Sequence, residues 1–397
     1  MTVPKSHPNL YEGERLEEVA GYPTLYKYLP GSKNVSRRAN AGTGTNADDG
    51  RRPLIVFIPG AAHLARIAYG GHAGYNPRDF LAYWLNDAGY DVLAISYPLE
   101  MYDSGAEVVP PHFPDFNIPA WGEQAAWTTR KVIDEHGLGD EVVVLGWSMG
   151  GRILKPFVVS AQECRLDIKL FVAVAGTPAG IMGVRAVTPK ICRTAAGYGA
   201  CATFEKSFVR QIRETQEREG SGKPAIVDEK VYFREYFGHT PVRLGSWGLN
   251  YCAADDENIE RSGFVTDEWD SLRDGGPSGQ DYNLYPFVAA IRPTSASDLR
   301  HVLTDNATWG LILTLKLTAD VTKALSSRTA LDNEDYRRLI NLVYSAPTEM
   351  TETVPGNHFF FIGETGARRT ATAIFQLLFK MEKIRKEMAM LLERLKN

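Results

Sequence analysis

Two apolar patterns alternate between residues 54 and 175 of the chain. Four short segments are almost entirely apolar, which is typical of strands buried in a parallel sheet: Leu54–Ile58, Asp91–Tyr97, Val142–Leu145 and Ile168–Ala175. Longer segments between them, Asn76–Gly89 and Ala120–His136, place an apolar residue at every third or fourth position and predict amphipathic helices. Strands that alternate with helices in this way predict an α/β fold with right-handed parallel crossovers.

The pattern is less regular on both sides of this region. Residues 24–29 alternate like an edge strand, and residues 31–53 are polar and aperiodic like a surface loop. Residues 178–300 interrupt the alternation with a charged helical run at 204–219 and many aromatic residues. The apolar runs Trp309–Leu317 and Ile340–Ala346 then predict a return to the sheet.

The last segment of the chain predicts one long helix. Its apolar residues are spaced alternately by three and four positions, as in a coiled-coil seam: Ile374, Leu377, Met381, Ile384, Met388, Leu391 and Leu395. Two interpretations remain open. The helix lies on its own domain, or it packs against a second subunit and makes the protein a homodimer.

Composition limits the classes of partner. The chain has 397 residues, 44% hydrophobic and 23% charged, with a formal net charge of -4. These values give no electrostatic reason to expect nucleic acid or an anionic membrane as a partner. No apolar stretch approaches membrane-spanning length, and the polar first residues do not predict a secretory signal, so we expect a cytoplasmic protein. The four cysteines lack metal-ligand spacing, and no phosphate-binding loop is present, so we expect no metal and no cofactor.

The strongest chemical signal follows the strand Val142–Leu145. There the chain reads Gly146-Trp147-Ser148-Met149-Gly150, which matches the G-x-S-x-G nucleophile elbow. A serine at a sharp turn from strand to helix has strained backbone, and small flanking residues are needed for close packing. The apolar strand before the motif and the helix-compatible residues after it provide the context that the motif requires.

With these residues, the chain resembles the α/β-hydrolase superfamily from about Leu54 to about Leu378. The resemblance implies a mostly parallel sheet flanked by helices, and a Ser–acid–His triad in that chain order. It also implies that the insertion after the strand at 168–175 is a largely helical lid. We therefore expect N-terminal edge strands and a loop at 1–53, a core at 54–177 and 301–379, a lid at 178–300, and a helical extension at 380–397.

The segment Pro59-Gly60-Ala61-Ala62-His63 follows the first buried strand, where the family places its oxyanion loop, usually with His-Gly in place of Pro-Gly. The donors to an oxyanion are backbone N–H groups, so the resemblance implies Ala61 and Met149 in this role. We expect Trp147, Ala62 and His63 to contact the substrate.

The resemblance also implies the other two triad residues. Asp320 follows the expected strand at 309–317 and is the first choice for the acid, with Asp305 and Asp332 as alternatives. A structural role for Asp320, as the cap of a short helix, remains open. His358 stands in a Gly-containing loop before the closing helix, where the family has its general base.

Together these residues predict a serine hydrolase that cleaves an ester or thioester of an apolar or cyclic small molecule. The resemblance leaves two alternatives open. An acyltransferase, or a thioesterase that cyclises or releases a biosynthetic chain, would use the same triad with another acyl acceptor. A non-catalytic ligand-binding protein would keep the fold without the chemistry.

Overall fold

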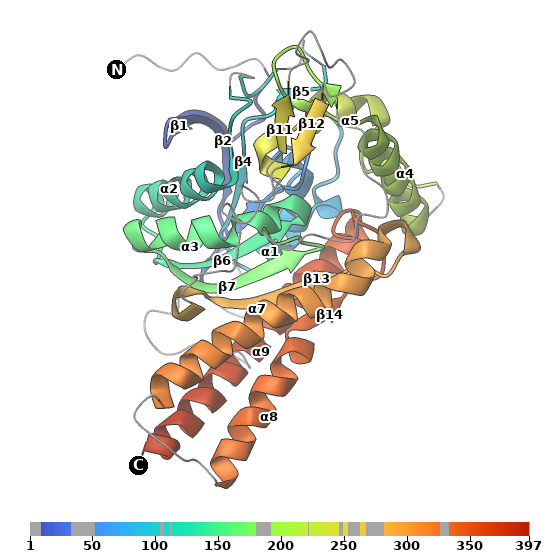
Figure 1. The fold of residues 1–397 in the computed structure, drawn as a ribbon. Coiled ribbons are helices and arrows are strands. Elements are labelled where there is room, and N and C mark those ends of the chain that lie inside the picture. The colour runs from blue at the N-terminus through green and yellow to red at the C-terminus, as the bar shows by residue number, and fades with distance from the viewer. Residues whose placement is uncertain are drawn as a thin grey trace.

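A mostly parallel sheet forms the centre of the molecule (Figure 1). The computed structural model describes residues 9–32, 52–103, 107–110, 113–179, 192–220, 222–245, 249–252, 263–266, 282–325 and 333–396. Within them the sheet has eight strands in the order β1-β2-β4-β3-β6-β7-β13-β14. The strands are β1 (Glu14–Val19), β2 (Tyr22–Leu29), β3 (Leu54–Ile58), β4 (Val92–Ser96), β6 (Glu141–Trp147), β7 (Asp167–Val174), β13 (Phe287–Arg292) and β14 (Thr351–Thr353).

The sequence pattern predicts this sheet well in its first half. β3, β4, β6 and β7 lie where uninterrupted apolar runs predict buried strands, and the whole of β3 and β4 is buried. All neighbours from β4 to β14 pair in parallel, whereas β1 and β2 add an antiparallel edge. The predicted mostly parallel sheet is therefore confirmed. The segment at 24–29 is a strand as predicted, but it is not at the edge, because β2 pairs with β1 on one side and with β4 on the other.

Helices flank the sheet, as the periodic segments predict. α2 (Ile118–His136) packs against α3 (Leu154–Glu163), and the short α1 (Leu81–Asp87) packs against α9 (Glu364–Lys396). Asn117 caps α2 by accepting a hydrogen bond from Ala120 N–H, and Gly137 ends the helix with a φ of 62°. The left-handed backbone at this position explains why the helix stops at a glycine.

Two predicted strands are wrong. Residues 309–317 lie inside α7 (Leu299–Leu325), and residues 340–346 lie inside α8 (Glu334–Glu349). A short apolar run does not distinguish a buried strand from a buried helix. Burial within these segments follows helical spacing: Trp309, Ile312, Leu313, Lys316 and Leu317 are buried in α7, whereas Leu311 is 53% exposed.

The strand that continues the sheet after β7 is β13, which lies inside the range predicted for the lid. Phe287 to Ile291 pair in parallel with Leu170 to Val174 of β7. The predicted domain boundary at residue 300 is therefore too late, because the core resumes at or before Phe287. The inserted region between β7 and β13 is correspondingly shorter.

The inserted region contains α4 (Ala202–Glu219) and α5 (Glu229–Glu235) together with several short strands. These are β8 (Cys192–Arg193), β9 (Gly199–Ala200), β10 (Gly238–His239), β11 (Leu249–Cys252) and β12 (Gly263–Thr266), with β10 pairing to β5 (Glu100–Met101) of the core. Tyr232, Tyr236 and Phe237 are buried in the same hydrophobic cluster as the sheet, where Tyr232 contacts His63 and Tyr236 contacts His72. Trp247 and Trp269 lie outside the described residues.

α7, α8 and α9 form a helical bundle that extends from the sheet (Figure 1). The predicted apolar seam of α9 is buried within the chain from Ile374 to Leu391. Since α7 and α8 pack against α9, the pattern that suggested a dimer is accounted for by packing within one chain. Among the described helices, none has an apolar stretch long enough to cross a membrane.

Candidate active site

Ser148 stands at the junction between β6 and the short helix η5 (Ser148–Ile153), with a φ of 52°. This left-handed conformation is strained for a residue other than glycine. The flanking glycines permit the turn. A Cβ at Gly150 would lie 2.6 Å from the carbonyl oxygen of Ile58, and a Cβ at Gly146 would lie 2.8 Å from the carbonyl oxygen of Gly150. The backbone therefore has the geometry that the elbow motif predicts.

The loop after β3 passes directly beside the serine. A Cβ at Gly60 would lie 2.8 Å from the Cβ of Ser148. Tyr97 donates a hydrogen bond to the carbonyl of Gly60 at 2.9 Å, and Ala62 N–H donates to Thr240 Oγ1 at 2.8 Å. These contacts fix the backbone on both sides of Ala61. The predicted role of Ala61 N–H and Met149 N–H as oxyanion donors remains a prediction.

His63 and Trp147, both predicted to contact the substrate, are fully buried, and Ala62 is 7% exposed. His63 Nδ1 lies 2.7 Å from the carbonyl oxygen of Ala61, which only accepts, so Nδ1 donates and Nε2 accepts from Tyr232 O–H at 2.8 Å. Burial lowers the pKa of His63 to about 3. His63 is therefore a neutral support of the loop, and the expected contact with substrate does not fit its burial.

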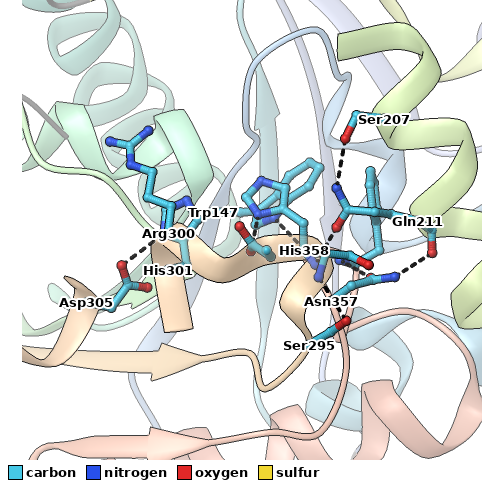
Figure 2. A network of polar contacts seen from close by, with 12 residues as sticks. Trp147, Ser207, Gln211, Ser295, Arg300, His301, Asp305, Asn357 and His358 are labelled. Atoms are coloured by element: carbon cyan, nitrogen blue, oxygen red, sulfur yellow. Dashed lines mark hydrogen bonds and ion pairs between the residues drawn. The ribbon is translucent and has the colours of Figure 1, made fainter. Parts of the chain in front are cut away.

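Trp147 links the serine side of the site to the predicted base. Its Nε1 donates to the carbonyl oxygen of His358 at 3.1 Å, and the two rings lie 5.3 Å apart (Figure 2). His358 follows β14 and precedes α9, so it lies after the last strand as predicted. The last strand is β14 and not the predicted strand at 340–346, which lies in α8. His358 still lies between the last strand and the closing helix.

The carboxylate partner of His358 is Asp298. Its Oδ2 accepts a hydrogen bond from His358 Nδ1 at 2.8 Å, and both side chains are largely buried. Asp298 belongs to the 3₁₀ helix η9 (Ala296–Asp298), which follows the carboxyl end of β13. The carboxyl ends of parallel strands meet at one edge of the sheet, so β6 and β13 deliver Ser148 and Asp298 to the same edge.

Asp320, the predicted acid, does not approach His358. It lies well inside α7, where its Oδ1 is 2.7 Å from Nζ of Lys316 one turn earlier. The prediction is wrong because the segment before Asp320 is a helix, so no strand end places this residue at the sheet edge. Asp305, one alternative, is bound to His301, and Asp332, the other, lies outside the described residues.

Asp298 is held in its ionised form, which is the form that accepts a hydrogen bond from an imidazole N–H. Burial alone would raise the pKa of this carboxyl, but the neighbouring imidazoles of His358 and His301 and the hydrogen bond from His358 outweigh burial. The pKa of Asp298 therefore lies below its ordinary value. A carboxylate that accepts from Nδ1–H leaves Nε2 of His358 as the basic nitrogen.

α4 holds the loop that carries His358. Oε1 of Gln211 accepts from His358 N–H at 3.0 Å, and the Gln211 carbonyl accepts from Nδ2 of Asn357 at 2.7 Å (Figure 2). Glu214 Oε2 accepts from Asn357 and from the hydroxyl of Ser297, next to Asp298. The inserted helix is therefore bonded to the base loop and to the acid loop at once.

One cluster brings three potential metal ligands together. A donor atom from each of Asp298, His301 and His358 lies within 4.8 Å of the others. The pairing of Asp298 with His358 and of His301 with Asp305 already uses these groups as hydrogen-bonding partners. The pairing of Asp298 with His358 is the one that an imidazole base requires, so this arrangement can do acid–base chemistry without a metal.

Asp298 is the carboxylate partner of His358 that the sequence analysis does not predict, although the sequence contains a signal for it. The run Phe287–Ile291 is apolar throughout, as in the other buried strands, and Asp298 follows it after a short Pro- and Ser-containing loop. Because the run lies inside the expected insertion, the sequence pattern assigns it to the lid and leaves Asp298 out of the predicted triad. A continuous apolar run is typical of a buried core strand even where it lies inside an insertion.

No model of a known protein family matches the chain, and no curated protein matches it in sequence. Solved structures do resemble it. They include an arylesterase, at 11% identity and a TM-score of 0.40 over 92% of this chain and 83% of the other. A thioesterase domain from the curacin biosynthetic pathway has 14% identity and a TM-score of 0.35 over 91% and 98%.

A serine hydrolase from the polyaromatic-hydrocarbon-degrading bacterium Cycloclasticus zankles has 11% identity and a TM-score of 0.38, over 92% of this chain and 96% of the other. Similarity at this level says nothing about activity. The evidence for the fold of this chain comes from its own structure, namely the strand order of the sheet and the strained backbone of Ser148 at the end of β6.

Proposed function

We propose that this chain, which has an α/β-hydrolase fold, is a serine hydrolase with Ser148 as nucleophile, His358 as general base and Asp298 as orienting acid. The observation that carries the proposal is the 2.8 Å hydrogen bond between His358 Nδ1 and Asp298 Oδ2. Trp147, which precedes the strained serine, is bonded to the same histidine. A serine, an imidazole and a carboxylate in this order are the parts of an acyl-transfer triad.

The reaction follows from the hydrogen bonds. Asp298 holds the proton on Nδ1 of His358, so Nε2 takes the proton of the Ser148 hydroxyl as Oγ attacks the carbonyl carbon. Backbone N–H groups of Met149 and Ala61 stabilise the oxyanion, each contributing on the order of 3 kcal/mol. His358 then protonates the leaving group, and an acyl-enzyme forms on Ser148. Water, deprotonated by His358, releases the acid and regenerates the serine.

Aromatic side chains beside the base favour an apolar acyl or leaving group. Phe208 of α4 lies parallel to the ring of His358 at 6.1 Å, and Phe204 stacks on Phe208 at 6.0 Å. Phe204 is 37% exposed, so apolar surface remains available next to the base. These contacts support an ester or thioester of an apolar small molecule, and they support the prediction that the inserted region covers the serine as a lid.

Covalent labelling tests the proposal. We expect a fluorophosphonate to add one adduct to the protein, seen by intact-mass spectrometry, and Ser148→Ala to abolish it while leaving thermal unfolding unchanged. Ser345→Ala, on the remote helix α8, is the matched control and keeps the adduct. An undiminished adduct on Ser148→Ala refutes the assignment. Product analysis with nitrophenyl esters, with and without an added alcohol or amine, then separates hydrolysis from acyl transfer.

A further inference from the structure

The loop that follows β3 is held by hydrogen bonds on both sides of Ala61. The Tyr97 phenol donates to the carbonyl oxygen of Gly60 at 2.9 Å. On the other side, Thr240 Oγ1 accepts from Ala62 N–H at 2.8 Å. Tyr97 directly follows the core strand β4, whereas Thr240 directly follows β10 of the inserted region. The core and the inserted region therefore each hold one of the two peptide units that meet at Ala61.

The bond from Tyr97 fixes the direction of the Ala61 N–H. The Gly60 carbonyl and the Ala61 N–H belong to one planar trans peptide unit, in which the two groups point in opposite directions. Among the described residues, none accepts a hydrogen bond from Ala61 N–H. Gly60 is so close to the nucleophile that a Cβ on it would lie 2.8 Å from the Cβ of Ser148. This unsatisfied donor therefore belongs to a peptide unit directly beside the serine.

The bond to Thr240 holds a strained residue. Ala62 has a φ of 64°, in the left-handed region that residues other than glycine rarely occupy. Such a backbone conformation persists only where surrounding contacts hold it. Both backbone polar groups of Ala62 bond to the inserted region, because its carbonyl accepts from Gly238 N–H at 3.0 Å. Thr240 is fixed in turn, since its own carbonyl accepts from Gly199 N–H at 2.9 Å.

Tyr97 and Thr240 also contact each other. The Tyr97 side chain is fully buried. Burial raises the pKa of its phenol, and hydrogen bonds from the Thr240 hydroxyl and from the N–H groups of Ala62 and His63 oppose this rise. The two hydroxyl groups therefore link the Ala62 N–H to the Gly60 carbonyl in one chain of hydrogen bonds around the loop.

We propose that Tyr97 and Thr240 are positioning residues that hold the Ala61 N–H in the direction of the oxyanion. The inference rests on the proposed function, because that reaction uses the Ala61 N–H. A donor stabilises an oxyanion when it already points to the place where the charge develops, and removing one donor lowers kcat by about 10²- to 10³-fold. A donor that is present but misdirected loses part of this effect. The inserted region then contributes to the oxyanion site itself, through Thr240.

The rate of fluorophosphonate labelling tests the proposal, because negative charge develops on the phosphoryl oxygen as the oxygen of Ser148 attacks phosphorus and fluoride leaves. Tyr97→Phe and Thr240→Val each remove a hydroxyl group and keep nearly the same volume. We expect each to slow formation of the adduct by about 10- to 100-fold, measured by intact-mass spectrometry. Thr240→Ser keeps the hydroxyl and labels at nearly the wild-type rate.

Two matched controls lose the same chemical groups elsewhere. Tyr28→Phe removes a hydrogen bond to Asp91, and Thr129→Val removes one to the Ala125 carbonyl, so neither touches the loop and both label at the wild-type rate. The double variant Tyr97→Phe, Thr240→Val tests whether the two residues act on one donor. We expect it to label little more slowly than the slower single variant, because residues in one hydrogen-bond network are not additive.

Three results overturn the proposal: labelling of both single variants at the wild-type rate, a Thr240→Ser as slow as Thr240→Val, or effects that multiply in the double variant. Thermal unfolding identifies any variant that does not fold, and either single variant that folds is sufficient for the test. A wild-type protein that forms no adduct on Ser148 refutes the proposed function, and the inference falls with it. A wild type that is labelled beside variants that are labelled equally fast refutes the inference alone.

Discussion

The serine side and the acid–base side of the site are built by different means. On the serine side, β6 and the turn after it set the geometry through backbone strain at Ser148 and two glycines close to it in sequence. On the acid–base side, Asp298 and His358 are 60 residues apart, and the Gln211 side chain that accepts from His358 N–H is 147 residues away from it. One side is encoded locally and the other by side-chain hydrogen bonds between distant segments.

This difference determines how substitutions affect each side of the site. A local turn is specified by steric exclusion, so a single added methyl group disturbs it. A hydrogen-bonded network is shared among several side chains, so the loss of one partner shifts the base without unfolding the chain. We therefore expect an added side chain at the glycines of the serine side to lower stability, and the loss of a hydrogen-bonding partner on the acid–base side to lower turnover.

The largest expected effect is on the acid. Asp298→Asn removes the carboxylate that fixes the tautomer of His358, and we expect kcat to fall by about 10⁴-fold. Asp320→Asn is the matched control. It breaks the ion pair with Lys316 within α7, which does not involve His358, and kcat stays at the wild-type value. Steady-state kinetics on a nitrophenyl ester measures both, and equal losses would contradict the assignment of Asp298.

The next effect is on the elbow. Gly150→Ala brings a Cβ to 2.6 Å from a backbone carbonyl of β3, and we expect the free energy of unfolding to fall by about 2–4 kcal/mol. Gly139→Ala, where nothing lies within 4 Å of the added Cβ, is the control and leaves stability unchanged within about 0.5 kcal/mol. Urea unfolding measures both values. Similar stability of the two variants would show that the elbow tolerates a side chain.

The smallest of these effects concerns the support of the base loop. Gln211→Ala removes the acceptor of His358 N–H, so we expect kcat to fall by about tenfold to 100-fold, with KM changed much less. Gln216→Ala on the same helix removes hydrogen bonds to Pro224 and Ile226 that do not involve the site. If both variants lose kcat equally, the effect comes from α4 as a whole and not from the bond to His358.

The contrast between local and distant contacts also explains which parts of the site the sequence predicts. β3, β6 and the elbow are recognised because their signals lie within a few consecutive residues. Asp298 is missed because its identity depends on whether the run before it is a strand of the core or part of an insertion. That choice is made by parallel pairing of β13 with β7, a contact between segments more than 100 residues apart.

The helices show the complementary difficulty. An apolar run such as Trp309–Leu317 fits a buried strand or a buried helix equally well in one sequence. Tertiary packing of α7 against α8 decides in favour of the helix, and it moves Asp320 away from the sheet edge. His358 nonetheless lies between the last described strand, β14, and the closing helix α9, and this place depends only on the order of the elements along the chain.

The hydrogen bonds of α4 also limit how far the inserted region of this chain can be replaced by another segment. Glu219 at the end of α4 accepts from the N–H groups of Thr365 and Gly366 in the first turn of α9, in addition to the contacts of Gln211 and Glu214 with the base and acid loops. Replacing the inserted region would leave donors in three core segments without these acceptors: Asn357, Ser297 and the first turn of α9. The inserted region is therefore not a separable module, and a chimera that replaces it has to retain α4.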